Sequence, residues 1–387
     1  MPLAVYVLGL AIFAQGTSEL MLAGLLPELA ADLGVSIPGA GLLISAFALG
    51  MLVGAPVLAV VTLRWPRRTA LLVFLAIFAL THVVAALTPS YGVLFATRVV
   101  GAFVYAGFWA VAATTAIGLT ELKGKAMGIV AGGLTVATIV GLPAGTVIGQ
   151  HLGWRAAFWA VAAMSALVMI GVFATIPRQV SGAVPRIKHE LRAMANPRLW
   201  LSYATTALTT GATLATFSYL APLLTDVTGL PAAWVPGVLA LYGVGSLVGI
   251  TIGGRTSDTR PFPTLYAGAV ALVVISVAIA LFAGVPLLAV PLVVLLGGFG
   301  FAINPALNTR VFAEAGAAPT LATATNFSAF NVGITAGPWL GGLAIGAGLG
   351  YRSVAWLGAA LALAALATVA VAARTAARTR VALVTGR

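Results

Sequence analysis

Residues 263–284 read PTLYAGAVALVVISVAIALFAG, a run of 22 residues without a charged side chain. A helix of about 20 apolar residues is long enough to cross the hydrocarbon core of a bilayer. Similar runs recur along the whole 387-residue chain, which is 61% hydrophobic and only 7% charged. Because a soluble domain carries roughly 25% charged residues, the sequence predicts an integral membrane protein without a separate soluble domain.

Clusters of Pro, Gly, Asp and Arg divide the chain into twelve apolar segments. The segments are unbroken apolar runs, whereas membrane β-barrels show short segments of alternating hydrophobicity. The predicted fold class is therefore an all-α membrane protein with twelve transmembrane helices. The predicted spans are residues 3–26, 39–61, 68–88, 91–118, 125–149, 155–176, 199–223, 233–253, 263–284, 286–309, 321–346 and 352–373.

Lys and Arg residues are distributed unevenly over the loops. With the N-terminus placed in the cytoplasm, all but three of the 20 basic residues lie in cytoplasmic loops or the tail. The three exceptions are Arg98, Arg155 and Arg352. Because cytoplasmic loops carry an excess of Lys and Arg, we predict a multi-pass protein of the cell inner (plasma) membrane with both termini cytoplasmic. The net charge of +12 is dispersed over these loops, which argues against a nucleic-acid partner.

The longest polar stretch, residues 177–198, separates the sixth predicted span from the seventh. We interpret it as a cytoplasmic linker between an N-terminal six-helix half (1–176) and a C-terminal half (199–375), with a cytoplasmic tail at 376–387. The halves share residues at a spacing of 195, so that Gly50 recurs as Gly245 and Pro143 recurs as Pro338. Internal repeats of this kind are typical of transporters. The two halves are therefore expected to be pseudo-symmetric.

Three motifs occupy the positions that this topology assigns to them. Residues 16–27 of the first span read GTSELMLAGLLP, the fourth span contains Arg98-Val-Val-Gly101, and the loop after the eighth span, residues 254–260, reads GRTSDTR. In these motifs the chain resembles the major facilitator superfamily over nearly its whole length. It is most similar to the twelve-span drug:proton antiporters, and among them to actinobacterial chloramphenicol efflux proteins. The resemblance implies the major facilitator fold and a transporter, not an enzyme.

The resemblance also implies a gate on the cytoplasmic side. In the loop signature, Asp258 at the helix end would pair with Arg255 and hold the inner side closed. The corresponding loop after the second span has Ala59 and Leu63 where the Gly and the Asp are expected. Only the copy after the eighth span is therefore complete. For the copy after the second span, a gate and a basic loop that only sets the orientation of the protein are equal alternatives.

Glu19 is the carboxylate of greatest interest, because it lies inside an apolar span. A charge there costs about 3 kcal/mol on insertion scales and is rarely kept without a use. Arg98 is expected at a similar depth, since the first span runs outward and the fourth runs inward. We predict that Glu19 and Arg98 interact and carry proton coupling, the alternative being a permanent structural pair. His82 in the third span suits hydrogen-bonded packing better than proton relay.

Helical spacing places Gln15 on the Glu19 face of the first span, and Tyr105 and Trp109 on the Arg98 face of the fourth. An apolar pocket with a few amides and hydroxyls suits a small, neutral, amphipathic solute. For each side chain taken alone, helix packing is an equal alternative. The predicted substrate-binding residues are Gln15, Tyr105, Trp109, Thr213, Phe217, Asn326, Phe330 and Asn331.

These features together predict a secondary active exporter that exchanges protons for a small neutral drug of the chloramphenicol type by alternating access. Efflux of a sugar or a purine nucleoside by the same fold is the alternative. An intramembrane enzyme is a remote alternative, since the sequence lacks zinc-protease and Ser-nucleophile motifs, and it also lacks the phosphate-binding Lys loop of an ATP-driven pump. There is no cysteine to form disulfides or bind metals, and no cofactor is expected. The expected partners are the substrate, protons and the lipid bilayer, with the chain acting as a monomer.

Overall fold

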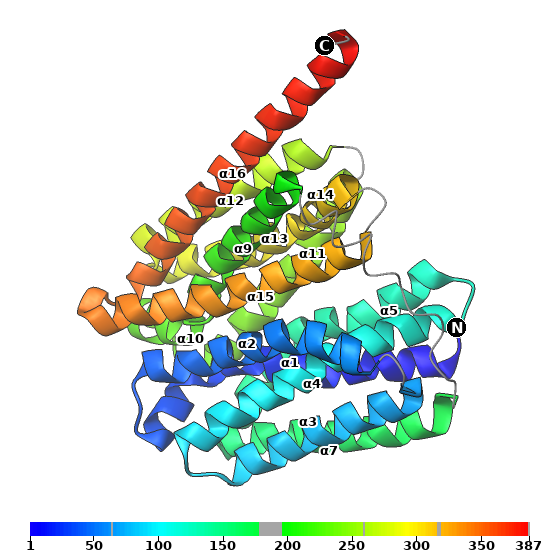
Figure 1. Ribbon diagram of the computed structural model, residues 1–387. Coiled ribbons are helices and arrows are strands. Elements are labelled where there is room, and N and C mark those ends of the chain that lie inside the picture. Colours follow the sequence, from blue (N-terminus) through cyan, green and yellow to red (C-terminus); the bar gives the residue numbers. More distant parts are fainter. Residues whose placement is uncertain (63–64, 178–195, 258–259, 316–318, 386–387) are drawn as a thin grey trace. The chain divides into compact units, whose positions relative to one another are not determined.

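The computed structural model describes the whole chain except residues 63–64, 178–195, 258–259, 316–318 and 386–387 (Figure 1). Every regular element in the described residues is a helix. Eleven helices in this part of the chain are long and apolar enough to cross a membrane. One further pair of helices, bent where the two meet, raises the number to twelve when it counts as a single span. The predicted all-α membrane fold is confirmed.

Two compact units share the chain. The first contains Met1–Val184 and Ser218–Gly243, and the second contains Pro185–Phe217 and Val244–Arg387. The first unit begins with α1 (Leu3–Leu33), α2 (Ile37–Val61), α3 (Arg67–Leu87), α4 (Tyr91–Gly118), α5 (Lys123–Val136), η1 (Ala137–Gly141), α6 (Leu142–Leu152) and α7 (Trp154–Thr175). It also includes α10 (Leu220–Pro222), η2 (Leu223–Val227), η3 (Ala232–Trp234) and the start of α11 (Val235–Ser257).

The second unit contains the remaining helices. They are α9 (Pro197–Phe217), the larger part of α11, α12 (Pro261–Phe282), α13 (Pro286–Ala302), α14 (Asn304–Ala315), α15 (Pro319–Ala344), η4 (Ile345–Leu349) and α16 (Arg352–Thr385). Within this unit α9 packs against α15 and α16, and α12 packs against α13 and α16. In the first unit α1 contacts α5, α6 and α7, while α3 lies between α4 and α7 (Figure 1).

The seventh predicted span, 199–223, is broken. The helix α9 ends at Phe217, and the chain continues into α10 and η2 with a bend of 46°. Pro222 accounts for the break, because the proline ring clashes with the carbonyl four residues earlier, that of Ser218, and proline has no N–H to bond to it. One apolar segment of the sequence therefore forms two helical pieces.

Two helices continue past the predicted ends of their spans. The helix α1 runs through Pro27 to Leu33 and stops at Gly34, whose φ of 63° lies in the left-handed region that glycine adopts readily. The helix α16 continues to Thr385, through most of the predicted tail. Hydrophobicity identifies only the part of a helix that lies in the bilayer. Each predicted span therefore ends before the polar residues at the end of its helix, such as Asp32 in α1.

Glycine lets α2 and α4 approach closely in the first unit. A Cβ atom added to Gly50 would overlap the backbone oxygen of Val99. The second unit repeats this contact 195 positions later, where a Cβ atom on Gly245 would overlap the backbone oxygen of Val294. Small residues at close crossings are typical of membrane helices. The repeated contact is the structural counterpart of the internal duplication that the sequence predicted.

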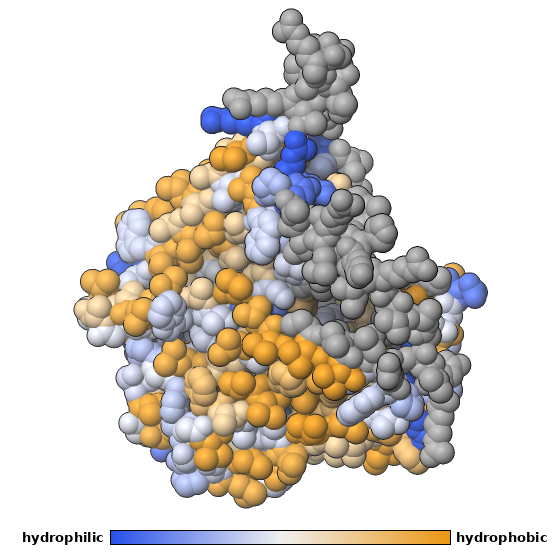
Figure 2. Space-filling model, in the orientation of Figure 1, coloured by the Kyte–Doolittle hydropathy of each residue, from blue (hydrophilic) through white to orange (hydrophobic). Residues whose placement is uncertain are grey.

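Apolar side chains cover much of the surface seen in Figure 2. On α3 and α7, for example, the exposed fraction is 61% for Leu80, 65% for Ile170 and 58% for Phe173. Soluble monomers rarely expose large contiguous apolar patches, whereas the hydrocarbon core of a bilayer favours them. The surface composition thus agrees with the membrane-spanning length of the helices.

Candidate functional site

Arg98 on α4 is fully inside the first unit and is held by α1. Its Nη1 donates to the Oγ of Ser18 at 2.8 Å, and its Nη2 donates to the backbone oxygen of Ser18 at 3.1 Å. The guanidinium carbon lies 4.2 Å from the centre of the Phe47 ring, which adds a cation–π contact. Its Nε atom has no hydrogen-bond partner among the described residues. Both Nη atoms are thus engaged by α1, while the Nε atom is left open.

Glu19, the next residue on α1, is the second member of the predicted coupling pair. Its carboxyl group accepts a hydrogen bond from Tyr105 and is attracted by the charge of Arg98. Glu19 is partly exposed, whereas Arg98 and Tyr105 are 2% exposed each. The structure therefore brings Glu19, Arg98 and Tyr105 together, with Ser18 as the residue that Arg98 bonds directly.

His82 on α3 contacts the same serine. The Nε2 atom of His82 lies 2.5 Å from the Oγ of Ser18, and its Nδ1 atom lies 2.7 Å from the backbone oxygen of Phe78. The imidazole is stacked near the rings of Phe78 and Phe158, with centroid distances of 4.3 and 5.6 Å. The sequence identified His82 as a packing residue and did not identify Ser18 at all.

The other predicted residues of the first unit are Gln15 and Trp109. Gln15 is 1% exposed, and its Nε2 atom donates to the backbone oxygen of Ala11 in its own helix at 3.4 Å. Trp109 lies on α4 one turn beyond Tyr105 and is partly exposed. Of the two, Trp109 presents the more accessible surface.

A chain of polar side chains crosses three helices of the second unit. Thr206 on α9 donates to the Oδ1 of Asn326 on α15 at 2.8 Å. The Nδ2 of Asn326 donates in turn to the Oδ1 of Asn308 on α14, also at 2.8 Å. Both ends of the Asn326 amide are therefore engaged within the protein, a contact pattern that sequence spacing alone could not supply.

The remaining predicted substrate residues of the second unit have different surroundings. Thr213 donates to the backbone oxygen of Thr209 at 3.1 Å, and Phe217 is buried. Phe330 packs against a hydrophobic cluster formed by Leu265, Ala269, Ile303, Ala306, Leu307 and Val369. Asn331 is 1% exposed, its Nδ2 atom donates to the backbone oxygen of Phe327 at 3.0 Å, and its Oδ1 atom is buried without a partner among the described residues. Asn331 therefore keeps an open acceptor.

Half of the predicted cytoplasmic gate can be located. Arg255 is exposed in the last turn of α11, where a positive charge interacts favourably with the helix dipole. Its predicted partner, Asp258, lies outside the described residues.

A second polar cluster of the first unit joins α1, α3 and α7 at their ends. Asp32 at the end of α1 forms an ion pair with Arg155 at the start of α7 and accepts a hydrogen bond from the Trp154 indole at 3.0 Å. Arg155 also donates to the backbone oxygen of Thr88, just after α3, at 3.2 Å. Trp154 and Arg155 thus tie α1, α3 and α7 together at their ends.

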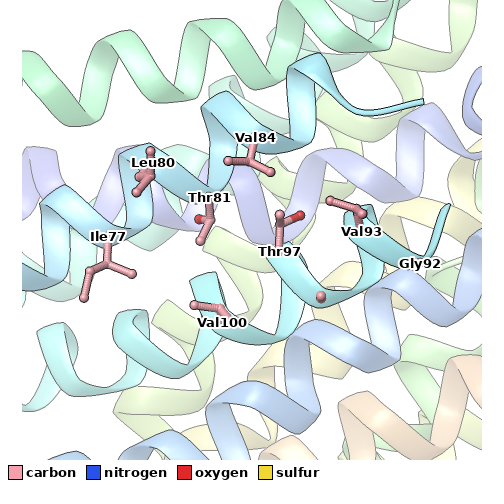
Figure 3. A pocket seen from close by; sticks show the side chains of 9 residues that line it. Ile77, Leu80, Thr81, Val84, Gly92, Val93, Thr97 and Val100 are labelled. Carbon is pink, nitrogen blue, oxygen red and sulfur yellow. The ribbon is translucent and has the colours of Figure 1, made fainter. Parts of the chain in front are cut away.

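An apolar groove of about 410 Å³ runs between α3 and α4 (Figure 3). Its walls carry aliphatic side chains such as Ile77, Val84 and Val100. The hydroxyl groups of Thr81 and Thr97 in the wall donate to the backbone oxygens of Phe78 and Leu94. The groove therefore offers methyl groups and satisfied hydroxyls, and it differs in chemistry from the Glu19–Arg98 cluster.

Interacting charges inside membrane-spanning helices are typical of proteins that move ions or solutes across a bilayer. The class defined by the fold and the site is thus a multi-pass membrane transporter. A family model described as Major Facilitator Superfamily matches residues 8–326. The chain belongs to the major facilitator superfamily, and it is a transporter of small molecules, not an enzyme.

Two curated relatives align with almost the whole chain. The "Chloramphenicol resistance protein" of Streptomyces lividans is 44% identical over 362 residues, which cover 92% of each chain. The "Inner membrane transport protein YdhP" of Escherichia coli strain K12 is 36% identical over 369 residues, which cover 95% of each chain. Among solved structures, the nucleoside transporter NupG has a TM-score of 0.74 at 16% identity, covering 96% of this chain and 99% of that one. At that identity the likeness shows the fold alone.

Proposed function

We propose that the chain exports a small, neutral, amphipathic drug of the chloramphenicol type in exchange for protons. The observation that carries the proposal is the carboxyl group of Glu19, a partly exposed residue, placed next to the charge of Arg98 and the hydroxyl of Tyr105. A carboxyl group with polar partners for its ionised form, inside an otherwise apolar span, is suited to gain and lose a proton. The 44% identity with a relative named for chloramphenicol resistance supports the choice of substrate.

Glu19 is the proton carrier in this proposal. When Glu19 is ionised, the carboxylate is stabilised by Arg98 and by the Tyr105 hydroxyl. When Glu19 is protonated, the charge of Arg98 is left without its counter-ion and relies on Ser18 and Phe47. The two protonation states therefore differ in the forces between α1 and α4. A helix pair whose attraction changes with protonation is a suitable element for coupling proton movement to alternating access.

The substrate contacts follow from the same proposal. In the first unit Gln15, Tyr105 and Trp109 present an amide and two aromatic rings from α1 and α4. In the second unit the open Oδ1 acceptor of Asn331 suits a hydroxyl or amide N–H of a neutral solute. Thr213, Phe217, Asn326 and Phe330 complete the set of proposed contacts. Side chains of these types suit a ligand with an aromatic ring and a few polar groups.

The proposed movement is alternating access of the two sequence halves, residues 1–176 and 199–375, joined by the linker 177–198. Arg255 and Asp258 form the cytoplasmic gate, both termini face the cytoplasm, and the protein acts as a monomer in the inner (plasma) membrane. One intramembrane acid is consistent with exchange of protons for a neutral compound.

Drug accumulation in a susceptible bacterial host tests the function. Expression of the chain is expected to lower the steady-state accumulation of labelled chloramphenicol, and a proton uncoupler is expected to restore it. Cells that carry the empty vector, with and without the uncoupler, provide the control. Unchanged chloramphenicol accumulation at a verified level of membrane-inserted protein would contradict the drug assignment. Lowered accumulation that the uncoupler does not restore would contradict proton coupling.

A further inference from the structure

His82 is a buried titratable residue that the proposed mechanism does not yet use. It is 3% exposed and lies on α3, where both ring nitrogens have partners. The Nδ1 atom is 2.7 Å from the backbone oxygen of Phe78, and the Nε2 atom is 2.5 Å from the Oγ of Ser18. Phe78 and Phe158 pack against the ring and fix its plane. The imidazole is thus held in one orientation.

The direction of each hydrogen bond follows from the chemistry of the partners. A backbone carbonyl oxygen can only accept, so the Nδ1 atom of His82 carries a proton and donates it to Phe78. In the neutral ring the Nε2 atom is then an acceptor, and the hydroxyl of Ser18 donates to it. The Ser18 oxygen keeps its lone pairs for the Nη1 of Arg98. Donation therefore runs in one direction, from Arg98 to Ser18 and from Ser18 to His82.

A doubly protonated His82 would not fit this arrangement. Its Nε2–H would also donate to the Ser18 oxygen, and the hydroxyl proton of Ser18 would have to find another acceptor. The added charge would lie close to that of Arg98. The charge that acts on the ring is that of Arg98 on α4, whereas α1 contacts it through Ser18, the residue before Glu19, and α7 presents Phe158. The neutral ring is therefore the form that supports Arg98.

We propose that His82 is a positioning residue for proton coupling, which rests on the function proposed above. Through the Ser18 hydroxyl, His82 orients the acceptor that holds the Arg98 guanidinium, and so it sets how Arg98 is shared between Ser18 and Glu19. His82 does not carry the transported proton in this proposal. Removing the imidazole frees the Ser18 hydroxyl to rotate, and Arg98 then keeps only its bond to the backbone oxygen of Ser18 in a fixed position.

The test compares variants in proteoliposomes that contain the purified protein. His82→Leu and Ser18→Ala are expected to lower the initial rate of chloramphenicol uptake driven by a pH gradient by about tenfold, the order expected for a lost hydrogen bond to a charged group. The KM for the drug and the gradient-free exchange of labelled for unlabelled chloramphenicol are expected to stay near the wild-type values. His82→Gln, whose amide oxygen can accept from Ser18, is expected to retain most of the gradient-driven rate.

Three outcomes of the transport assay would overturn the inference. A wild-type gradient-driven rate in His82→Leu would show that the ring does not position Arg98. A His82→Gln variant as impaired as His82→Leu would show that an ionisable ring is needed and that His82 carries a proton. Equal loss of gradient-driven uptake and of exchange in all variants would indicate a purely structural role.

A second measurement separates this inference from the proposed function. The thermal midpoints of detergent-solubilised His82→Leu, Arg98→Gln and the double variant form a cycle that requires no transport. The double variant is expected to be no less stable than the less stable single variant, because both substitutions break the same chain of hydrogen bonds. Additive shifts would overturn the inference. A wild type that fails to move chloramphenicol while the cycle is non-additive would overturn the proposed function alone.

Discussion

Arg98 is joined to Ser18 by two hydrogen bonds, although the residues lie 80 positions apart in the chain. One bond goes to the side chain and the other to the backbone of the same residue, so the guanidinium plane is fixed against α1. This leaves the charge of Arg98 next to Glu19, and the electrostatic attraction between them does not depend on a direct salt bridge. The site therefore uses the two Nη donors of the guanidinium group as well as its charge.

Replacing Arg98 with lysine keeps the charge but removes the planar pair of nitrogen donors. An ammonium group cannot make two parallel bonds to one residue and is more strongly hydrated. We expect Arg98→Lys to lower gradient-driven uptake by about tenfold, as for the loss of a hydrogen bond made by a charged group. The rate in proteoliposomes measures this, with Arg352→Lys as the control because Arg352 is exposed. Full activity of Arg98→Lys would show that the charge alone suffices.

Glutamine at position 19 tests the proton carrier. The amide of Glu19→Gln has nearly the shape of the protonated carboxyl but cannot ionise. We expect proton-driven uptake into inverted vesicles to be abolished, while the protein still inserts and gradient-free drug exchange continues. The exposed acid of Asp226→Asn is a matched control that should leave uptake unchanged. Gradient-driven accumulation by Glu19→Gln would remove Glu19 from the proton role.

The scarcity of charge made Glu19 and Arg98 visible in the sequence, because a charge inside an apolar span is costly. Opposite chain directions then suggested a similar depth for the two residues. The contact between Ser18 and His82 could not be found this way, since a serine or histidine in a helix carries no signal of its partner. Which faces of two helices meet depends on their rotation and tilt, and apolar faces on all sides leave that rotation undetermined.

The polar chain of the second unit shows the same limit. Sequence spacing indicated that Asn326 and Asn331 were polar residues in a membrane helix, but it could not separate packing from ligand contact. In the structure Asn326 is engaged at both ends of its amide, whereas Asn331 keeps an open acceptor. Likewise, apolar content identified the seventh span, and the local effect of Pro222 broke it. The different surroundings of Asn326 and Asn331 therefore lead to two different predictions, one on stability and one on drug binding.

Asn326→Ala is expected to destabilise the protein. The substitution removes the bonds to Thr206 and Asn308 and leaves the partly buried Asn308 oxygen without its donor. The loss should be about 1–3 kcal/mol in the free energy of unfolding, measured as a lower thermal midpoint in detergent. Thr205 also makes a side-chain bond between helices, to Thr368 at 2.8 Å. Because the Thr368 hydroxyl keeps its bond to the backbone oxygen of Ala365, Thr205→Val is the milder comparison, and an equal loss in both would contradict a special role of Asn326.

Asn331→Ala is expected to affect drug binding more than stability. Its Oδ1 atom has no protein partner in the described chain, so truncation breaks only the bond to the backbone oxygen of Phe327. We expect the apparent KM for chloramphenicol to rise roughly threefold or more, as for one lost neutral hydrogen bond. Uptake at several drug concentrations, together with the thermal midpoint, separates the two effects. An unchanged KM would assign Asn331 to packing.

Gly249 on α11 is expected to tolerate no side chain, because a Cβ atom there would overlap the backbone oxygen of Gly298 on α13. Backbone atoms cannot move aside as a flexible side chain can, so Gly249→Ala must push the two helices apart. Overpacking of this kind costs about 1–3 kcal/mol. Gly237→Ala on the same helix is the matched control, since an added Cβ atom meets nothing within 4 Å. Thermal midpoints in detergent should therefore fall for Gly249→Ala and hold or rise for Gly237→Ala. Equal midpoints for the two variants would mean that the α11–α13 crossing is looser than the structure describes.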